Sequence, residues 1–334
     1  MRRPTVAKPP LPDPPMSEVT HNPWPHRLAL ITVLVSLLPV SMGALTTTLD
    51  AGMAFNDWPS SDGHNMLTYP WFRSYGDKFV EHGHRLAGML IGVVAIGLVF
   101  VTWRTEKRQW VRFVALMVLL GVIGQGLLGG SRVRLDTRIL AMIHGQFAAW
   151  VVSLMALLCC FTSRRWPSPK LPENTDRASG AVPFVCLVPF LIVVQYTLGG
   201  LLRHRHTAMQ EHLVFSFVVM VFSLLAAVML WRTQVRWLRG SAMMLMGLVL
   251  AQMLLGAGAW ITRFGLPATG FVATVRSLPQ IWFRTLHTVV GMMLFAGSVV
   301  AVARTLRVAS LVRQPVIQRQ SHTVGSTVLS GGAS

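Results

Sequence analysis

Four histidines lie where a membrane protein would hold a metal-containing ligand. Each falls near the start of an apolar segment, and each is followed four residues later by a small residue: His84 by Gly88, His144 by Ala148, His212 by Ser216 and His287 by Gly291. An ionisable side chain in a lipid environment is costly unless it binds something. A small residue one helical turn away leaves room for a flat ligand. The pattern therefore predicts a membrane protein that holds porphyrins.

A single histidine inside a membrane can instead hydrogen-bond a neighbouring helix without binding a metal. Four histidines at matched positions with matched small residues favour the ligand function. His82, His204 and His206 lack this spacing and belong to loop ends. We expect these three to be solvated surface residues.

The elements that must position the four histidines are transmembrane helices. Of all residues 52% are hydrophobic and 13% are charged, and the mean hydropathy is +0.52. A helix of about 20 residues spans a bilayer, and eight apolar stretches approach this length: 28–46, 82–103, 111–129, 139–161, 183–201, 211–231, 241–261 and 283–303. We predict an all-α integral membrane protein with eight transmembrane helices.

The net charge of +18 is explained by topology better than by nucleic acid. Lys and Arg are more numerous in the N-terminal arm, in alternate connections and in the C-terminal tail. The positive-inside rule then places both termini in the cytoplasm. The N-terminal arm has no transit-like pattern, which favours a bacterial cytoplasmic membrane. We predict membrane lipid as a partner and no nucleic acid.

The even-numbered helices then run from the outside inward, so the histidines lie toward the outer face. A Gln followed four residues later by Gly closes the third, fifth and seventh helices, at 125–130, 195–200 and 252–257. This repeat predicts two pseudo-twofold-related four-helix bundles. We divide the chain into a disordered cytoplasmic arm, the first bundle, a linker, the second bundle and a disordered tail: 1–27, 28–161, 162–182, 183–303 and 304–334. His84 with His144, and His212 with His287, would each sandwich a heme.

A carboxylate distinguishes the two bundles. Glu81 precedes His84 by three residues, which places it on nearly the same helix face about 4.5 Å along the axis. Beside a heme edge it could act as a base or stabilise a developing cation, or it could simply pair with Arg85. Glu211 immediately precedes His212 and points about 100° away. The first bundle is therefore expected to be catalytic and the second to carry electrons.

These residues resemble a known family. The Glu81, His84 and Arg85 element, the four histidines, the glutamine and glycine motifs and the outer-loop segment 56–59 look like heme A synthase, over about residues 28–303. The resemblance implies oxidation of a methyl group of heme O to a formyl group, giving heme A for a terminal oxidase. Some members carry a cysteine pair in the first outer loop, and residues 47–80 here contain no cysteine.

The resemblance also implies roles for the candidate residues. His84 and His144 would flank the substrate heme, with Glu81 and Arg85 as catalytic candidates, while His212 and His287 would ligate a heme b. Implied partners are a heme O synthase, a terminal oxidase and an electron acceptor that the sequence does not identify.

Arginines in the outer loops are candidates for the anionic heme propionates, because a guanidinium binds a carboxylate with two hydrogen bonds. They are Arg132, Arg134, Arg138, Arg203, Arg205, Arg276 and Arg284. From these we select Arg134 and Arg203.

Two other functions use the same ligands. A di-heme b-type cytochrome would pass electrons from quinol without altering its hemes, and it has no evident need for a carboxylate beside one heme alone. A heme carrier would need a release path with aligned polar residues, and few cross the inner half of the membrane.

Overall fold

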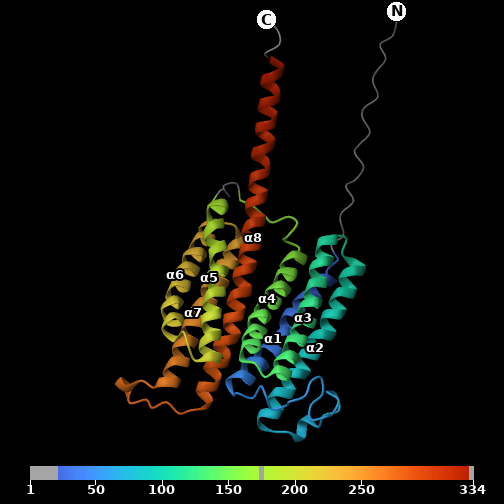
Figure 1. The fold of residues 1–334 in the computed structure, drawn as a ribbon. Coiled ribbons are helices and arrows are strands. Elements are labelled where there is room, and N and C mark those ends of the chain that lie inside the picture. Colours follow the sequence, from blue (N-terminus) through green and yellow to red (C-terminus); the bar gives the residue numbers. More distant parts are fainter. Residues whose placement is uncertain (1–21, 173–176, 331–334) are drawn as a thin grey trace, which may run out of the picture.

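Eight long helices form the molecule (Figure 1). The computed structural model describes residues 22–172 and 177–330, with side chains as far as residue 312. Within this part of the chain eight helices are long and apolar enough to cross a membrane, which confirms the predicted class. They are α1 Trp24–Thr48, α2 Gly76–Thr105, α3 Gln109–Leu135, α4 Arg138–Thr162, α5 Arg177–Arg205, α6 Met209–Arg232, α7 Arg236–Phe264 and α8 Leu278–Ser330. Two short 3-10 helices, η1 Trp71–Arg73 and η2 Pro267–Thr269, lie in loops.

Each helix is longer than the apolar stretch that predicted it. The largest difference is at the end of α8, where the apolar span reaches residue 312. Val308 and Ala309 are buried there, and the guanidinium of Arg307 donates to the carbonyl of Trp166 at 3.1 Å. The boundary predicted at residue 303 is therefore too early, because these contacts continue the helix. The other predicted disordered segment, 1–27, lies mostly in residues 1–21, outside the described residues, and α1 begins at Trp24.

The helices group in two sets of four. In the first set α1 packs against α2 and α4, and α3 packs against α2 and α4; the second set repeats this arrangement with α5 to α8. The sets meet where α4 contacts α8 and α5, and where α1 contacts α8. Exchanging α1–α4 with α5–α8 maps every one of these helix pairs onto another. The predicted pseudo-twofold axis would produce such a pattern, and it stays a prediction.

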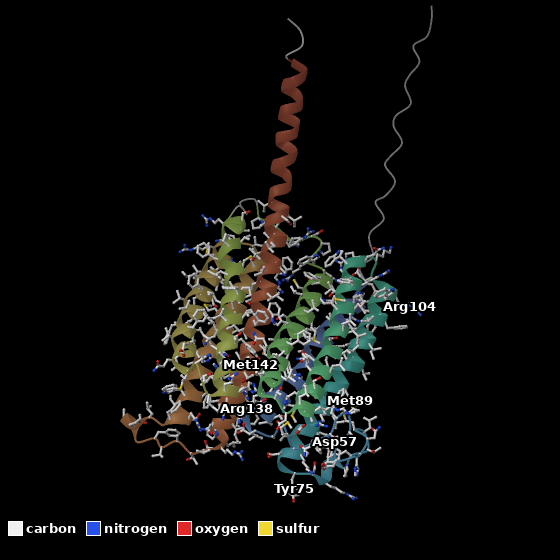
Figure 2. All side chains as sticks on the ribbon, in the orientation of Figure 1. Asp57, Tyr75, Met89, Arg104, Arg138 and Met142 are labelled. Atoms are coloured by element: carbon white, nitrogen blue, oxygen red, sulfur yellow. The ribbon has the colours of Figure 1, made fainter. Side chains whose placement is uncertain are left out.

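Each set is packed at one end and hollow at the other. We call the end that carries the connections 49–75, 136–137, 206–208 and 265–277 the loop end. At the opposite end small and branched apolar side chains such as Leu98, Val118 and Leu158 form a buried core, and a second core fills the same half of α5–α8. In Figure 2 Asp57 and Tyr75 lie at the loop end, and Arg104 lies at the far end of α2. The hollow halves must hold the site.

The outward faces of the helices are apolar, as a lipid environment requires. Leu254 is 73% exposed and Val214 is 68% exposed, and exposed Leu, Ile, Val and Phe side chains recur along the outer faces of the other helices. Contiguous apolar surface of this extent is unfavourable in water. Its position on the outside of the bundles fits helices that face hydrocarbon.

Candidate functional site

A cavity of about 1710 Å³ occupies the hollow halves of both helix sets. A pocket for one drug-sized ligand measures about 300–1,000 Å³, so this volume suits two large ligands. All four candidate histidines line it, and so do the four small residues that follow them, Gly88, Ala148, Ser216 and Gly291. As the spacing in the sequence predicted, each imidazole and the small residue beside it lie on the cavity wall.

In the first set, His84 of α2 faces His144 of α4. Their ring centroids are 6.3 Å apart, and the ring planes cross at 86°. With metal–nitrogen bonds of about 2 Å and about 1 Å from each nitrogen to its ring centre, two imidazoles on opposite sides of one metal have ring centres about 6 Å apart. The pair has the separation of two axial ligands.

The second set repeats this geometry. His212 of α6 and His287 of α8 have ring centroids 6.2 Å apart and ring planes that cross at 80°. Among the described residues no three His, Cys, Asp or Glu side chains gather to hold a metal ion. Each histidine pair thus supplies two donors, and the remaining donors would come from the ligand, as they do for iron in a porphyrin. The residues present fit two hemes.

A glycine on the preceding helix lies under each histidine. A Cβ atom added at Gly43, Gly129, Gly199 or Gly256 would come within 2.8, 3.3, 3.1 or 3.0 Å of the Cε1 atom of His84, His144, His212 or His287. These approaches leave no room for a side chain. They explain the glycines that close α3, α5 and α7, which the sequence marked as a repeat without giving their purpose.

The fourth member of the repeat escaped the sequence analysis. In α3, α5 and α7 the glycine follows a glutamine by four residues, whereas Gly43 follows Pro39, inside α1. The Nδ1–H group of His84 donates to the carbonyl of Pro39 at 3.0 Å. The first copy of the repeat has a proline in place of the glutamine, so it does not match the other three. The four-residue spacing before the glycine is the signal that would have identified it.

The glutamines hold the other three histidines. Nε2 of Gln125 donates to the backbone carbonyl of His144 at 3.2 Å, and Nε2 of Gln195 donates to that of His212 at 2.9 Å. The Nδ1–H group of His287 donates to the backbone carbonyl of Gln252 at 3.2 Å. Partners of this kind fix the orientation of a metal-binding imidazole.

Glu81 and Arg85 form a buried ion pair on the cavity wall. Nη2 of Arg85 lies 2.7 Å from Oε1 of Glu81, with 6% and 5% of the two side chains exposed. Oε2 of Glu81 accepts from the backbone N–H groups of Ala54 at 2.7 Å and Phe55 at 3.3 Å. Three donors therefore hold the carboxylate in one orientation, and both members of the pair line the cavity.

A family model described as cytochrome oxidase assembly protein, COX15-CtaA, matches residues 73–214. The matched segment contains the ion pair and His84, His144 and His212. Over this segment the chain is similar to the COX15-CtaA family.

Individual relatives of this chain carry the name heme A synthase. The relative from Mesorhizobium japonicum is 29% identical over 168 residues, which are 47% of this chain and 45% of that protein. The one from Shouchella clausii is 28% identical over 188 residues, 55% of this chain and 60% of that protein. The one from Rhizobium rhizogenes is 33% identical over 151 residues, 41% of this chain and 40% of that protein. The matched region of the chain thus spans about half the length of these curated relatives.

The two arginines selected for propionates lie differently in the structure. Arg203 lines the cavity, and its Nη2 donates to the carbonyl of Ala44 and to Oγ1 of Thr48, both at 2.7 Å. Arg134 is exposed and lies off the cavity wall, where Arg132 stands instead. The two residues face different directions, because residues two apart on a helix point about 200° apart. A propionate contact of Arg134 stays a prediction.

His82 corrects a second expectation. It was predicted to be a solvated loop-end residue, but it is 1% exposed. Its Nδ1 hydrogen-bonds Oγ of Ser61 at 3.1 Å, and its ring lies 4.5 Å from that of Tyr69, measured between centroids. The first loop folds over the start of α2 and encloses His82, a long-range contact that local spacing does not reveal. His206 is exposed as predicted, while His204 is partly buried, and both line the cavity.

The Glu81–Arg85 pair and His82 anchor the loop of residues 49–75 to α2. Nη1 of Arg85 donates to the carbonyls of Asp57 at 2.9 Å and Ser60 at 2.6 Å. The Asp57 carboxylate in turn accepts from the backbone N–H groups of Asp62 at 3.0 Å and Gly63 at 2.8 Å. Desolvation opposes ionisation of Asp57, but these hydrogen bonds outweigh it and lower its pKa below the ordinary 3.8.

Proposed function

We propose that this protein is a heme A synthase, which oxidises a methyl group of heme O to a formyl group. One observation carries the proposal: two histidine pairs have the spacing of axial ligand pairs, and a buried Glu81–Arg85 pair is near only one of them. The names of the relatives support the same activity. The asymmetry gives the two sites different tasks.

The first bundle, residues 28–161, is the proposed substrate site. His84 and His144 would hold heme O from its two faces. Glu81 lies one turn before His84 on the same side of α2 and on the same cavity wall. Its position suits it to accept a proton or to stabilise positive charge that develops at the substrate edge. Arg85 and the backbone of the first loop keep the carboxylate in place.

The second bundle, residues 183–303, is the proposed site of a resident heme b between His212 and His287. A heme there would supply one-electron redox chemistry. Glu211, the acidic residue beside its ligand, is exposed and is absent from the cavity wall, so this site has no counterpart of Glu81. Arg203 at its edge has the free donor that a propionate requires, since its buried Nε has no hydrogen-bond partner among the described residues.

We place the protein in a bacterial cytoplasmic membrane with both termini in the cytoplasm, as the distribution of Lys and Arg favours. The loop end and the cavity then lie toward the outer face. A heme O synthase would supply the substrate, and assembly of a terminal oxidase would use the product.

The decisive experiment is expression in a host that makes heme O but not heme A. Noncovalent hemes extracted from the purified protein are identified by chromatography with mass detection. Heme A or its hydroxylated precursor would support the synthase. Two unmodified heme b groups per chain, despite available heme O, would contradict it.

That second outcome would favour a di-heme b-type cytochrome that passes electrons from quinol. The near-identical separations of the two histidine pairs, 6.3 and 6.2 Å, favour this alternative, because two electron-transfer hemes have no need to differ. Glu81 would then serve only to anchor the first loop.

A further inference from the structure

The hydrogen bonds to the four histidine rings differ in one respect that bears on redox potential. Nδ1 of His84 and of His287 each meet a backbone carbonyl, those of Pro39 and Gln252. Nδ1 of His144 is buried and has no partner in the described part of the chain. Nδ1 of His212 meets a side chain instead, the amide of Gln195, at 3.1 Å, whereas the side-chain amide of Gln252 meets the other ring nitrogen of His287, Nε2, at 3.3 Å. A side chain can be changed without disturbing the helix backbone.

Gln195 is partly buried beside its histidine on the cavity wall. Its Nε2 also donates to the backbone carbonyl of His212 at 2.9 Å, and Gly199, one turn further along α5, lies against the imidazole. Its Oε1 is buried and has no hydrogen-bond partner within the described part of the chain, which is also true of Gln125 and Gln252. An unsatisfied buried acceptor costs about 1–3 kcal/mol, so the amide retains an acceptor for a donor that arrives with the ligand.

Metal binding supplies such a donor. A neutral imidazole that binds iron through Nε2 carries its proton on Nδ1. The Nδ1 atom of His212 then changes from acceptor to donor. Rotation of the Gln195 amide about its last side-chain bond would give up the hydrogen bond from Nε2 to the backbone carbonyl of His212 in exchange for one that Oε1 accepts from Nδ1–H. An acceptor at this position makes the imidazole a more basic ligand, and a more basic ligand stabilises ferric iron relative to ferrous iron.

We propose that Gln195 is a positioning residue for His212 that lowers the redox potential of the heme in the second bundle. This inference rests on the proposed function, because it requires a heme between His212 and His287. It assigns to Gln195 a role distinct from that of Gln125, whose amide reaches only the backbone of His144.

The test uses the full-length protein with its bound heme and two variants that act in opposite directions. Gln195→Leu removes the acceptor, so the midpoint potential of the second-bundle heme should rise. Gln195→Glu provides a stronger acceptor of the same shape, so the potential should fall. A tenfold change in the ratio of ferric to ferrous heme affinity corresponds to about 59 mV for a one-electron couple, and we expect shifts of that order in a spectroelectrochemical titration.

Gln280→Leu is the matched control. Gln280 is also buried in the second bundle, but its amide donates to the carbonyl of Thr262 and accepts from the backbone of Arg276. Its loss should leave the midpoint unchanged. An equal shift in this control would show that any buried glutamine alters the potential, and it would overturn the proposal.

The outcomes separate the two levels of inference. A wild-type protein with no heme in the second bundle refutes the proposed function itself. A wild-type protein with that heme, whose midpoint stays the same in Gln195→Glu, refutes the role of Gln195. If Gln195→Leu loses its heme on purification, the nearly isosteric Glu variant decides alone, because a fall in its midpoint supports the role and an unchanged or raised midpoint excludes it.

Discussion

At the scale of single residues, the four histidines proposed as ligands differ in the hydrogen bonds that orient their rings. His84, His212 and His287 each have a hydrogen bond at Nδ1, whereas Nδ1 of His144 has none among the described residues. Outer-shell partners of a metal-binding histidine contribute about 10–100-fold to affinity. We therefore expect the first site to release its ligand more readily, as the proposed substrate site would require.

The difference predicts unequal effects of two alanine variants in the first bundle. His84→Ala should lower retention of the substrate heme at least about tenfold more than His144→Ala, because His84 is the oriented ligand. Heme content after purification and optical spectra of the ferrous protein measure this. Equal losses in the two variants would contradict the predicted order, and the second-bundle heme is an internal control.

Glu81 gives the second prediction. Glu81→Gln should leave both hemes bound and slow conversion of the substrate by about 10²–10⁴-fold, the usual contribution of a general acid or base. Extracted hemes, quantified by chromatography, report both quantities. Glu211→Gln is the matched control, since it removes an exposed carboxylate next to a histidine of the second bundle. Unchanged conversion in the Glu81 variant would reduce its role to anchoring the first loop.

The third prediction concerns Arg203. Its guanidinium joins α5 to α1 and α8, and its Nε has no partner among the described groups. Loss of a charge-assisted hydrogen bond costs about 1.5–3 kcal/mol, so Arg203→Met should weaken retention of the second-bundle heme about tenfold or more. Arg205→Met, two residues later and exposed, should have no effect. A thermal release assay with both variants separates these results.

At the scale of elements, each of the four histidines is positioned by the helix that precedes its own helix in the sequence. Odd-numbered helices supply the glycine and the hydrogen bond, and even-numbered helices supply the histidine. The site is thus built from four helix pairs, and each pair must keep its register to within a fraction of a turn.

This dependence can be tested at Gly199. A Cβ there would lie 3.1 Å from the His212 ring, so Gly199→Ala should displace the imidazole and lower heme occupancy of the second bundle, and Gly199→Leu should abolish it. Gly180, in the same helix, has no atom within 4 Å of an added Cβ, and Gly180→Ala should be neutral. Full occupancy in Gly199→Leu would show that the contact is unimportant.

The first loop gives a pH-dependent prediction. The folded-state pKa of Asp57 is lowered, so its contribution to loop stability is complete above the unfolded value near 3.8 and is lost as the pH falls through the lower folded value. Cleavage of the 49–75 loop by an acid protease should therefore increase over that window. Asp57→Asn should remove this component, and an identical profile for both proteins would contradict the prediction.

At the scale of the whole molecule, much of the architecture could be predicted from the sequence. The hydropathy of the eight stretches predicts the spans, and the matched spacing of the histidines predicts their two pairings, because a repeated helix pair places equivalent residues at equivalent depths. Contacts made by a loop that is distant in the sequence could not be predicted. His82 is enclosed by residues 61 and 69, and Arg132 rather than Arg134 faces the cavity because of the rotation of α3.

The packed apolar halves of the two bundles bear on the side of the membrane at which the proposed reaction would release protons. Oxidation of a methyl group releases protons, and an ion in the middle of a bilayer costs several kcal/mol. The apolar cores beyond the cavity close the route across the membrane, whereas Glu81 and Arg85 contact the loop of residues 49–75. In the proposed reaction, protons from the chemistry would therefore leave through the loop end, and the reaction would acidify one side of the membrane only.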